Sequence, residues 1–117
     1  MLKLGHIELF VKNPMKSKDF YIDILGFELV VVQENQFVWV KSGEIEILLR
    51  AGTSAAESET YQSAKAGLVL YTDDVNATAN VYRERGLIFK GTENSDSCLT
   101  FTDPDGHWFQ LVNPNQD

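Results

Sequence analysis

Residues 5–30 read GHIELFVKNPMKSKDFYIDILGFELV, and apolar residues alternate with others at the start of this stretch. Successive residues of a β-strand point to opposite faces of a sheet, so the alternation predicts a strand over residues 3–11. One face of this strand carries Ile7, Leu9 and Val11, and the other carries His6, Glu8 and Phe10. The strand therefore has one side suited to a core and one side with functional groups.

The rest of the stretch contains the signals of a helix and a turn-rich region. Asn13 is a good N-cap, Pro14 suits the first helical position, and Gly26 is a typical left-handed stop. The helix face predicted to pack on a sheet carries Ser17, Phe20, Tyr21 and Ile24. Strand-like runs follow at residues 27–34, 36–41 and 44–50, with turns at Glu34-Asn35 and Ser42-Gly43. The first half is therefore predicted to be a βαβββ unit.

The second half repeats this order of elements. A strand at residues 66–72 leads to a helix that begins after Asp74, carries Val75, Thr78, Ala79 and Tyr82 on one face, and ends at Gly86. Further strands are expected near residues 87–92, 97–102 and 107–113, the last two joined by the turn Asp103-Pro104-Asp105-Gly106. The halves align with His6 on Gly67 and with Gly26 on Gly86, so the second half is one position shorter between these points.

These elements predict an α+β fold in which two βαβββ modules form a single domain over residues 1–117. Module one covers about residues 1–50, module two covers about residues 65–117, and the small, polar residues 51–64 form a linker or mobile loop. We expect the helices outside and the free faces of two curved, mixed sheets around a cavity. The expected core is Ile7, Leu9, Val11, Phe20, Ile24, Ile45, Ile47, Leu68, Leu70, Tyr82, Leu99, Phe101, Phe109 and Leu111.

The composition narrows the possible partners and surroundings. The net charge is −7 and no run of Lys or Arg could neutralise phosphates, so no nucleic-acid partner is expected. Cys98 is the only cysteine, which excludes an intrachain disulfide and fits a reducing compartment; we expect it to be a small filler. No apolar run is long enough for a membrane span, so the prediction is a cytoplasmic protein without a membrane partner.

Residues 5–30 and the closing segment FTDPDGHWFQLVNP (residues 101–114) resemble those of a known family. Together with the duplicated βαβββ order and the chain length, they make the chain similar to the vicinal-oxygen-chelate superfamily, the glyoxalase, bleomycin-resistance and dioxygenase group. The family includes isomerases, ring-cleaving dioxygenases, thiol transferases and drug-binding proteins, so the resemblance is specific for fold and much less specific for chemistry. It also implies a homodimer, because the family closes its cavities by pairing or swapping modules.

In metal-dependent members of this family, the first and last strands of both modules each supply one ligand. The resemblance places His6 and Glu46 at these positions in module one, and Gly67 and Gln110 in module two. Glycine supplies no donor and the neutral amide of Gln110 replaces the usual glutamate, so His6, Glu46 and Gln110 remain as predicted metal ligands. They would suit Mn²⁺, Fe²⁺, Ni²⁺ or Zn²⁺, and we expect any such ion to be weakly held.

Glu46 is also the candidate catalytic residue, as part of an acid/base site with Glu8. An amide at position 110 cannot accept the proton that glyoxalase-type isomerisation transfers, so ordinary glyoxalase I activity is disfavoured. Other interpretations stay open for His6, Glu46 and Glu8. His6 could line a pocket without binding metal, and Glu46 and Glu8 could face solvent at a wide cavity mouth. His107 is expected at a surface or edge, and not as a second histidine ligand.

Alternation along the strands also predicts which side chains would line the cavity and bind a ligand: Glu8, Phe10, Tyr71 and Trp108. Aromatic rings and carboxylates suit planar or cationic compounds. The alternative is that Trp39 and Trp108 are core or dimer-interface residues.

Two functions are therefore predicted, and the sequence leaves open whether the protein is an enzyme. The first is a glyoxalase/bleomycin-resistance-like protein that binds, and could sequester, a planar or cationic small molecule without a complete metal site. The second is a metal-dependent lyase, isomerase, transferase or dioxygenase that uses His6, Glu46 and Gln110. The ligand missing from module two favours the first.

Overall fold

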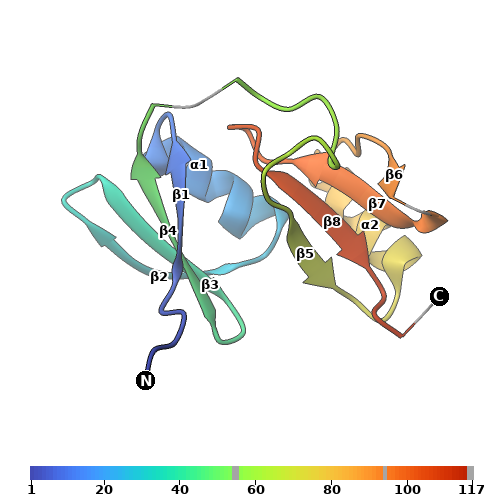
Figure 1. The fold of residues 1–117 in the computed structure, drawn as a ribbon, viewed down its shortest axis with the longest axis horizontal. Coiled ribbons are helices and arrows are strands. Elements are labelled where there is room, and N and C mark those ends of the chain that lie inside the picture. The colour runs from blue at the N-terminus through green and yellow to red at the C-terminus, as the bar shows by residue number, and fades with distance from the viewer. Residues whose placement is uncertain (54–55, 94, 116–117) are drawn as a thin grey trace. The chain divides into compact units, whose positions relative to one another are not determined.

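The computed structural model describes residues 1–53, 56–93 and 95–115. The chain forms two compact units, the first unit (residues 1–55) and the second unit (residues 56–117) (Figure 1). Residues 54 and 55 of the predicted linker lie outside the described residues. None of the described helices is long and apolar enough to cross a membrane.

The first unit is a four-stranded sheet with a helical segment on one face (Figure 1). In chain order its elements are β1 (Ile7–Val11), α1 (Pro14–Asp19), η1 (Phe20–Ile24), β2 (Glu28–Gln33), β3 (Phe37–Ser42) and β4 (Ile45–Ala51). The strands lie in the order β1-β4-β3-β2, with β1 parallel to β4 and the other pairs antiparallel.

The second unit has the same topology. Its elements are β5 (Leu68–Tyr71), α2 (Val75–Glu84), β6 (Thr92–Glu93), β7 (Ser95–Thr102) and β8 (Trp108–Val112), and the strand order is β5-β8-β7-β6. Here β5 is parallel to β8, and the remaining pairs are antiparallel. The predicted α+β fold of two βαβββ modules is therefore confirmed.

Both helices begin at the predicted caps. The side chain of Asn13 accepts hydrogen bonds from the amides of Met15 and Lys16, and the side chain of Asp74 accepts one from the amide of Ala77. These bonds satisfy amides that have no partner inside the helix. At the opposite ends, Gly26 and Gly86 have φ angles of 80° and 104°, the left-handed conformation that glycine adopts without strain.

The first helical segment differs from a continuous α-helix. After α1, residues Phe20–Ile24 form η1, a π-helical turn in which the amide of Leu25 donates to the carbonyl of Phe20. The wider turn still directs Phe20 and Tyr21 into the core, where they are 8% and 0% exposed.

The core lies between each helix and its sheet. Of the predicted core residues, Ile45 is wrong: it is 59% exposed, because it begins β4 directly after the Gly43 turn, at an end of the sheet that the described residues leave uncovered. The other predicted core residues are buried or half-buried.

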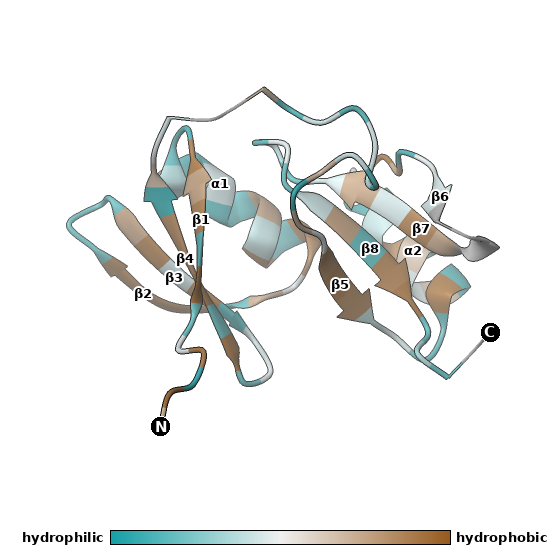
Figure 2. Ribbon diagram, viewed as in Figure 1, coloured by the Kyte–Doolittle hydropathy of each residue, from teal (hydrophilic) through white to brown (hydrophobic). Residues whose placement is uncertain are grey.

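In the second unit, the rings of Phe101 and Phe109 stack with their centroids 5.1 Å apart. Figure 2 shows a hydrophilic band interrupting the hydrophobic residues of β8, whereas β5 is hydrophobic along its length.

The strand predicted near residues 87–92 is mostly irregular, and β6 contains only Thr92 and Glu93. Gly91 has a φ of 111°, which an extended strand does not accommodate. The segment is nevertheless held beside β7, because the amide of Lys90 donates to the carbonyl of Thr100 and the amide of Thr100 donates to the carbonyl of Gly91.

Candidate functional site

The sheet of each unit has one face packed against its helix and one face opposite to it, which we call the open face. In the first unit, strand register aligns side chains of the open face in two rows across the sheet. One row contains Glu8, Leu48 and Trp39, and the other contains Phe10, Arg50 and Phe37. The predicted alternation of β1 is correct, because Leu9 and Val11 are buried while Glu8 and Phe10 are exposed.

Three charged or polar side chains of this face form a cluster, His6–Glu8–Arg50. Nε2 of His6 lies 2.9 Å from Oε2 of Glu8, and Nη1 of Arg50 donates to Oε1 of Glu8 at 3.2 Å. The His6 hydrogen bond is the main cause of a lowered pKa for Glu8; desolvation opposes it, and the hydrogen bond and charge of Arg50 lower the pKa further. Glu8 is therefore a carboxylate with both oxygens engaged.

Aromatic rings frame the cluster. The ring of Trp39 meets the ring of His6 edge to face at 4.7 Å, and its Nε1 donates to Oε1 of Gln33 at 3.1 Å. The guanidinium of Arg50 lies 5.8 Å from the centroid of Phe10 and 5.5 Å from that of Phe37. These distances are within the range of cation–π attraction.

Arg50 and Trp39 are site residues that the sequence interpretation missed. Trp39 lies opposite Leu48 in the register, so it belongs to the open face. Arg50 follows Glu46 by four residues on one strand, and alternation therefore places both on the same face. That signal was present in the sequence. Glu46 itself is exposed and pairs with Lys41 across the sheet. The pKa of Lys41 is raised, mainly by its hydrogen bond to Glu28, and the charges of Glu44 and Glu46 add to this effect.

Residues 57–61, which we call the covering segment, lie over Trp108 and Gln110 on the open face of the second unit. Its Ser58 carbonyl accepts a hydrogen bond from Nε1 of Trp108 at 2.9 Å, and Oη of its Tyr61 accepts one from Nε2 of Gln110 at 3.3 Å. Trp108 is only 3% exposed. Trp108 and Gln110 thus share a face, as predicted, but both contact the chain's own linker region.

Tyr61 also fills the space beside Gly67. A Cβ atom added at Gly67 would lie 2.6 Å from Cζ and 2.8 Å from Cε1 of Tyr61, and close to its hydroxyl oxygen. Carbon atoms do not approach so closely without a shift of one group. The tyrosine therefore occupies the position from which a larger side chain of β5 would extend.

The start of the covering segment is held by the turn before β8. A Cβ atom at Gly106 would lie 2.8 Å from Cγ of Glu57, and Oε1 of Glu57 lies 3.5 Å from Nζ of Lys90. Lys90 in turn donates to Thr102 at 2.7 Å and lies 5.9 Å from the centroid of Trp108. The part of the open face around Trp108 is therefore closely packed against residues of the same unit.

The same turn holds His107. Oδ1 of Asp103 accepts hydrogen bonds from the amides of Asp105 and His107, and Oδ2 lies 2.8 Å from Nδ1 of His107. The Asp103 bond is the main cause of a raised pKa for His107, which desolvation opposes and the charges of Asp103 and Asp105 reinforce. His107 is half-buried and stabilises the turn.

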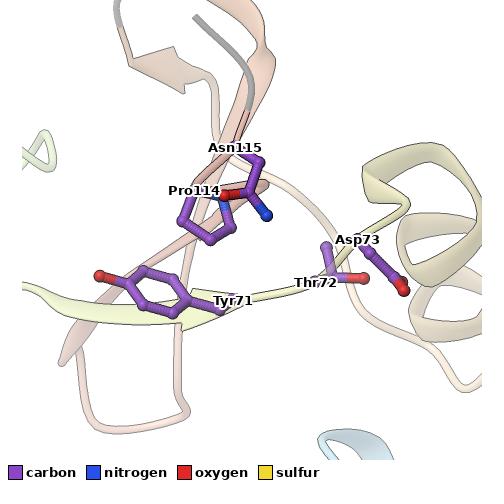
Figure 3. Close-up of a pocket in the computed structure, with 5 residues that line it drawn as sticks. All are labelled: Tyr71, Thr72, Asp73, Pro114 and Asn115. Atoms are coloured by element: carbon purple, nitrogen blue, oxygen red, sulfur yellow. The ribbon is translucent and has the colours of Figure 1, made fainter.

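Tyr71 lies apart from these contacts. It is 74% exposed and lines a pocket of about 290 Å³ together with Thr72, Asp73, Pro114 and Asn115. Figure 3 shows its ring beside Pro114, with Asp73 at the far side of the pocket. Among the residues that line this pocket, Tyr71 supplies the one aromatic ring.

Strand pairing in the second unit shows how the two predicted metal-ligand positions, Gly67 and Gln110, are related. Gln110 pairs with Val69, and Val69 follows Gly67 by two residues. The amide of Gln110 is bonded to Tyr61, and Gly67 has no donor. Neither position therefore presents a free anionic or imidazole ligand.

The same strand pairing in the first unit places Leu48, and not Glu46, at the position equivalent to Gln110. Glu8 follows His6 by two residues and pairs with Leu48, which makes Leu48 the register equivalent of Gln110. Glu46, the predicted ligand, lies two residues earlier on β4. The four equivalent positions hold an imidazole, a leucine, a glycine and an amide, which do not fit a tightly bound divalent ion. Within residues 1–53, 56–93 and 95–115, no group of three or more His, Cys, Asp or Glu side chains is arranged to hold a metal.

Comparisons with known proteins agree on a family. The family model described as the Glyoxalase/Bleomycin resistance protein/Dioxygenase superfamily matches residues 3–111. The sequence is 31% identical, over 103 residues, to catechol-2,3-dioxygenase of Bacillus subtilis (strain 168), a match that covers 79% of this chain and 35% of that protein. The chain therefore spans about a third of the length of this relative.

Solved structures of similar proteins have the same fold. TnmS3, an antibiotic binding protein from Streptomyces sp. CB03234, is 26% identical with a TM-score of 0.71, and the match covers 98% of this chain and all of that chain. The fosfomycin resistance protein FosX from Mesorhizobium loti is 16% identical with a TM-score of 0.76, and the match covers 98% of this chain and 94% of that chain. At this identity, the likeness to FosX concerns the fold alone.

Proposed function

Because the chain belongs to the glyoxalase/bleomycin resistance protein/dioxygenase superfamily, we propose that it binds a small planar molecule on the open face of the first unit, without a complete metal site. The observation that carries this proposal is the His6–Glu8–Arg50 cluster with Trp39 and Phe10 at its borders. Fixed polar groups beside aromatic rings are the usual composition of a small-molecule site.

The chemistry of the candidate ligands supports binding without a complete metal site. At the predicted ligand positions of module two, Gly67 supplies no donor and Gln110 supplies only a neutral amide. The imidazole of His6 and the carboxylate of Glu46 are then the only strong donors left among these positions. The similarity to TnmS3, which is described as an antibiotic binding protein, favours the same class of function.

The first unit is a better candidate than the second because the clustered polar side chains of its open face are accessible. The side chains of His6, Glu8 and Arg50 are 34%, 35% and 40% exposed, whereas Trp108 is 3% exposed under the covering segment. Of the predicted ligand-binding residues, Glu8 and Phe10 therefore belong to the proposed site. A role for Trp108 would require the covering segment to move away.

We also propose that the protein is a cytoplasmic homodimer. The edge strand β2 exposes Leu29, Val30 and Val31, each more than 40% exposed, and a second copy could cover these side chains. Sedimentation at tens of micromolar should then show a dimer, because a complex with a micromolar dissociation constant persists at that concentration. A monomer under these conditions would contradict the proposal.

The test of the main proposal combines metal analysis with ligand binding. Protein purified without chelator or affinity tag should contain substoichiometric first-row metal, and 2-naphthamide, a neutral planar probe, should bind equally well before and after chelation. Trp39→Ala should weaken that binding. Stoichiometric metal that is lost in both His6→Ala and Glu46→Ala would instead support the metal-dependent lyase, isomerase, transferase or dioxygenase.

A further inference from the structure

We infer that the open face of the first unit selects aromatic compounds with an acidic group, and that Arg50 binds this group. The inference rests on the proposed function, since it names the ligand class of the same face. It replaces the expectation of a cationic ligand, which rests on the carboxylates of Glu8 and Glu46 without their neighbours.

Arg50 has hydrogen-bonding capacity left over. A guanidinium has five N–H donors, and among the described residues this one makes a single hydrogen bond, to Glu8. Its Nε is buried and has no partner within the described chain. The side chain is 40% exposed, so a ligand can reach the outer part of the guanidinium. The rings of Phe10 and Phe37 hold it in place from the two neighbouring strands.

Glu8 is a weaker attraction for a cation than its charge alone would indicate. One of its oxygens is engaged by His6 and the other by Arg50. A cationic ligand would have to share the carboxylate with these partners and would lie beside the positive charge of Arg50. An anionic ligand keeps both contacts and adds a charge-assisted hydrogen bond to the same guanidinium.

The location of Trp39 suggests where the ring of the ligand lies. Trp39 and Arg50 are in adjacent rows on neighbouring strands, since Trp39 pairs with Leu48 and Arg50 is two residues further along β4. Such diagonal neighbours on one face of two adjacent strands lie about 7–8 Å apart, close to the length of a bicyclic ring. A flat aromatic acid can therefore contact Trp39 with its ring while its acidic group contacts Arg50.

The charge of the whole protein makes this inference easy to test. With a net charge of −7, the general electrostatic field favours cations over anions. A preference for an anionic probe must therefore come from a local group. Three probes share one ring system and differ in charge: 2-naphthoate, 2-naphthamide and 2-naphthyltrimethylammonium.

We expect wild-type protein, titrated by calorimetry at neutral pH, to bind 2-naphthoate roughly tenfold more tightly than 2-naphthamide, as one charge-assisted hydrogen bond would give. The cationic probe should bind most weakly. Arg50→Gln should remove the preference for naphthoate over naphthamide, and Arg50→Lys should restore part of it. Arg83→Gln is the matched control, because Arg83 also lies over a phenylalanine ring, at 4.9 Å from Phe89, but in the second unit.

The ranking of the probes on wild-type protein is informative even if Arg50→Gln does not fold. Equal binding of acid and amide, or tighter binding of the cation, would overturn the acidic-ligand inference while leaving the proposed binding function intact. A preference for acid that survives Arg50→Gln would overturn the role of Arg50. If all three probes bind more weakly than about 1 mM, both the inference and the proposed function fail.

Discussion

The two units share one topology but use their open faces differently. In the first unit, the face presents the half-exposed His6–Glu8–Arg50 cluster beside Trp39. In the second unit, the covering segment lies over the face and hydrogen bonds to Trp108 and Gln110. The strand order is the same in both. A sheet face of the same architecture can therefore be a candidate site or part of a core, depending on what a neighbouring segment places on it.

The largest expected difference between the two faces is in the stability lost when a tryptophan is removed. Trp108→Ala should lower the free energy of unfolding by about 3–5 kcal/mol, the usual cost of deleting a large buried ring. Trp39→Ala should cost roughly 1 kcal/mol, as expected for a half-buried residue, and should weaken naphthoate binding. Denaturant unfolding of both variants measures the difference. Equal costs would mean that the first face is packed as fully as the second.

A smaller effect is expected at Gly67. Gly67→Ala should be about 1 kcal/mol less stable than Gly5→Ala, because its methyl group displaces Tyr61 and breaks the bond to Gln110. The comparison removes the effect of alanine on the unfolded chain, which both variants share. A Cβ atom at Gly5 meets nothing within 4 Å. If the penalty is unchanged in a Tyr61→Ala background, Tyr61 is not the obstacle.

The pH dependence of the second unit should follow His107. The Asp103 hydrogen bond raises the pKa of His107 above its ordinary value of 6.5, so the folded state binds this proton more tightly than the unfolded state. The resulting stability is fully present below pH 6.5 and is lost as pH rises through the raised pKa. Unfolding at a series of pH values should show this decline, and His107→Gln should flatten it. An unchanged slope in the variant would assign the decline to another group.

The smallest effect is expected in the first unit, at the opposite end of the pH scale. Hydrogen bonds from His6 and Arg50 lower the pKa of Glu8 below its ordinary value of 4.5. The stability from these contacts is fully present above pH 4.5 and is lost as pH falls through the lowered pKa. Glu8→Gln should reduce the acid sensitivity of unfolding slightly. An unchanged acid sensitivity in this variant would contradict the assignment.

Local sequence signals predicted most of the fold. Alternation identified the faces of β1 and β8, and Asn13, Asp74, Gly26 and Gly86 marked the helix ends. These signals work because they depend on a few neighbouring residues. The exposure of Ile45 depends instead on where the helix stops covering the sheet, which its own alternation cannot reveal.

The candidate site was predicted less completely for the same reason. The positions of His6, Glu8 and Phe10 on one face followed from alternation, but their partners come from distant segments. Arg50 is 42 residues from Glu8, and Tyr61 is 49 residues from Gln110. Residues 57–61 have no periodicity, so nothing local indicated that Tyr61 would lie beside Gly67.

The π-turn η1 accounts for a difference in length between the two repeats. The stretch from the Asn13 cap to Gly26 is one position longer than the stretch from the Asp74 cap to Gly86. A hydrogen bond from residue i+5 to residue i encloses one more residue than the bond of an α-helix, and the bond between Leu25 and Phe20 is of this kind. If the two halves descend from one ancestral unit, a single codon gained or lost was absorbed inside a helix, while both strand orders and both terminal glycines were retained.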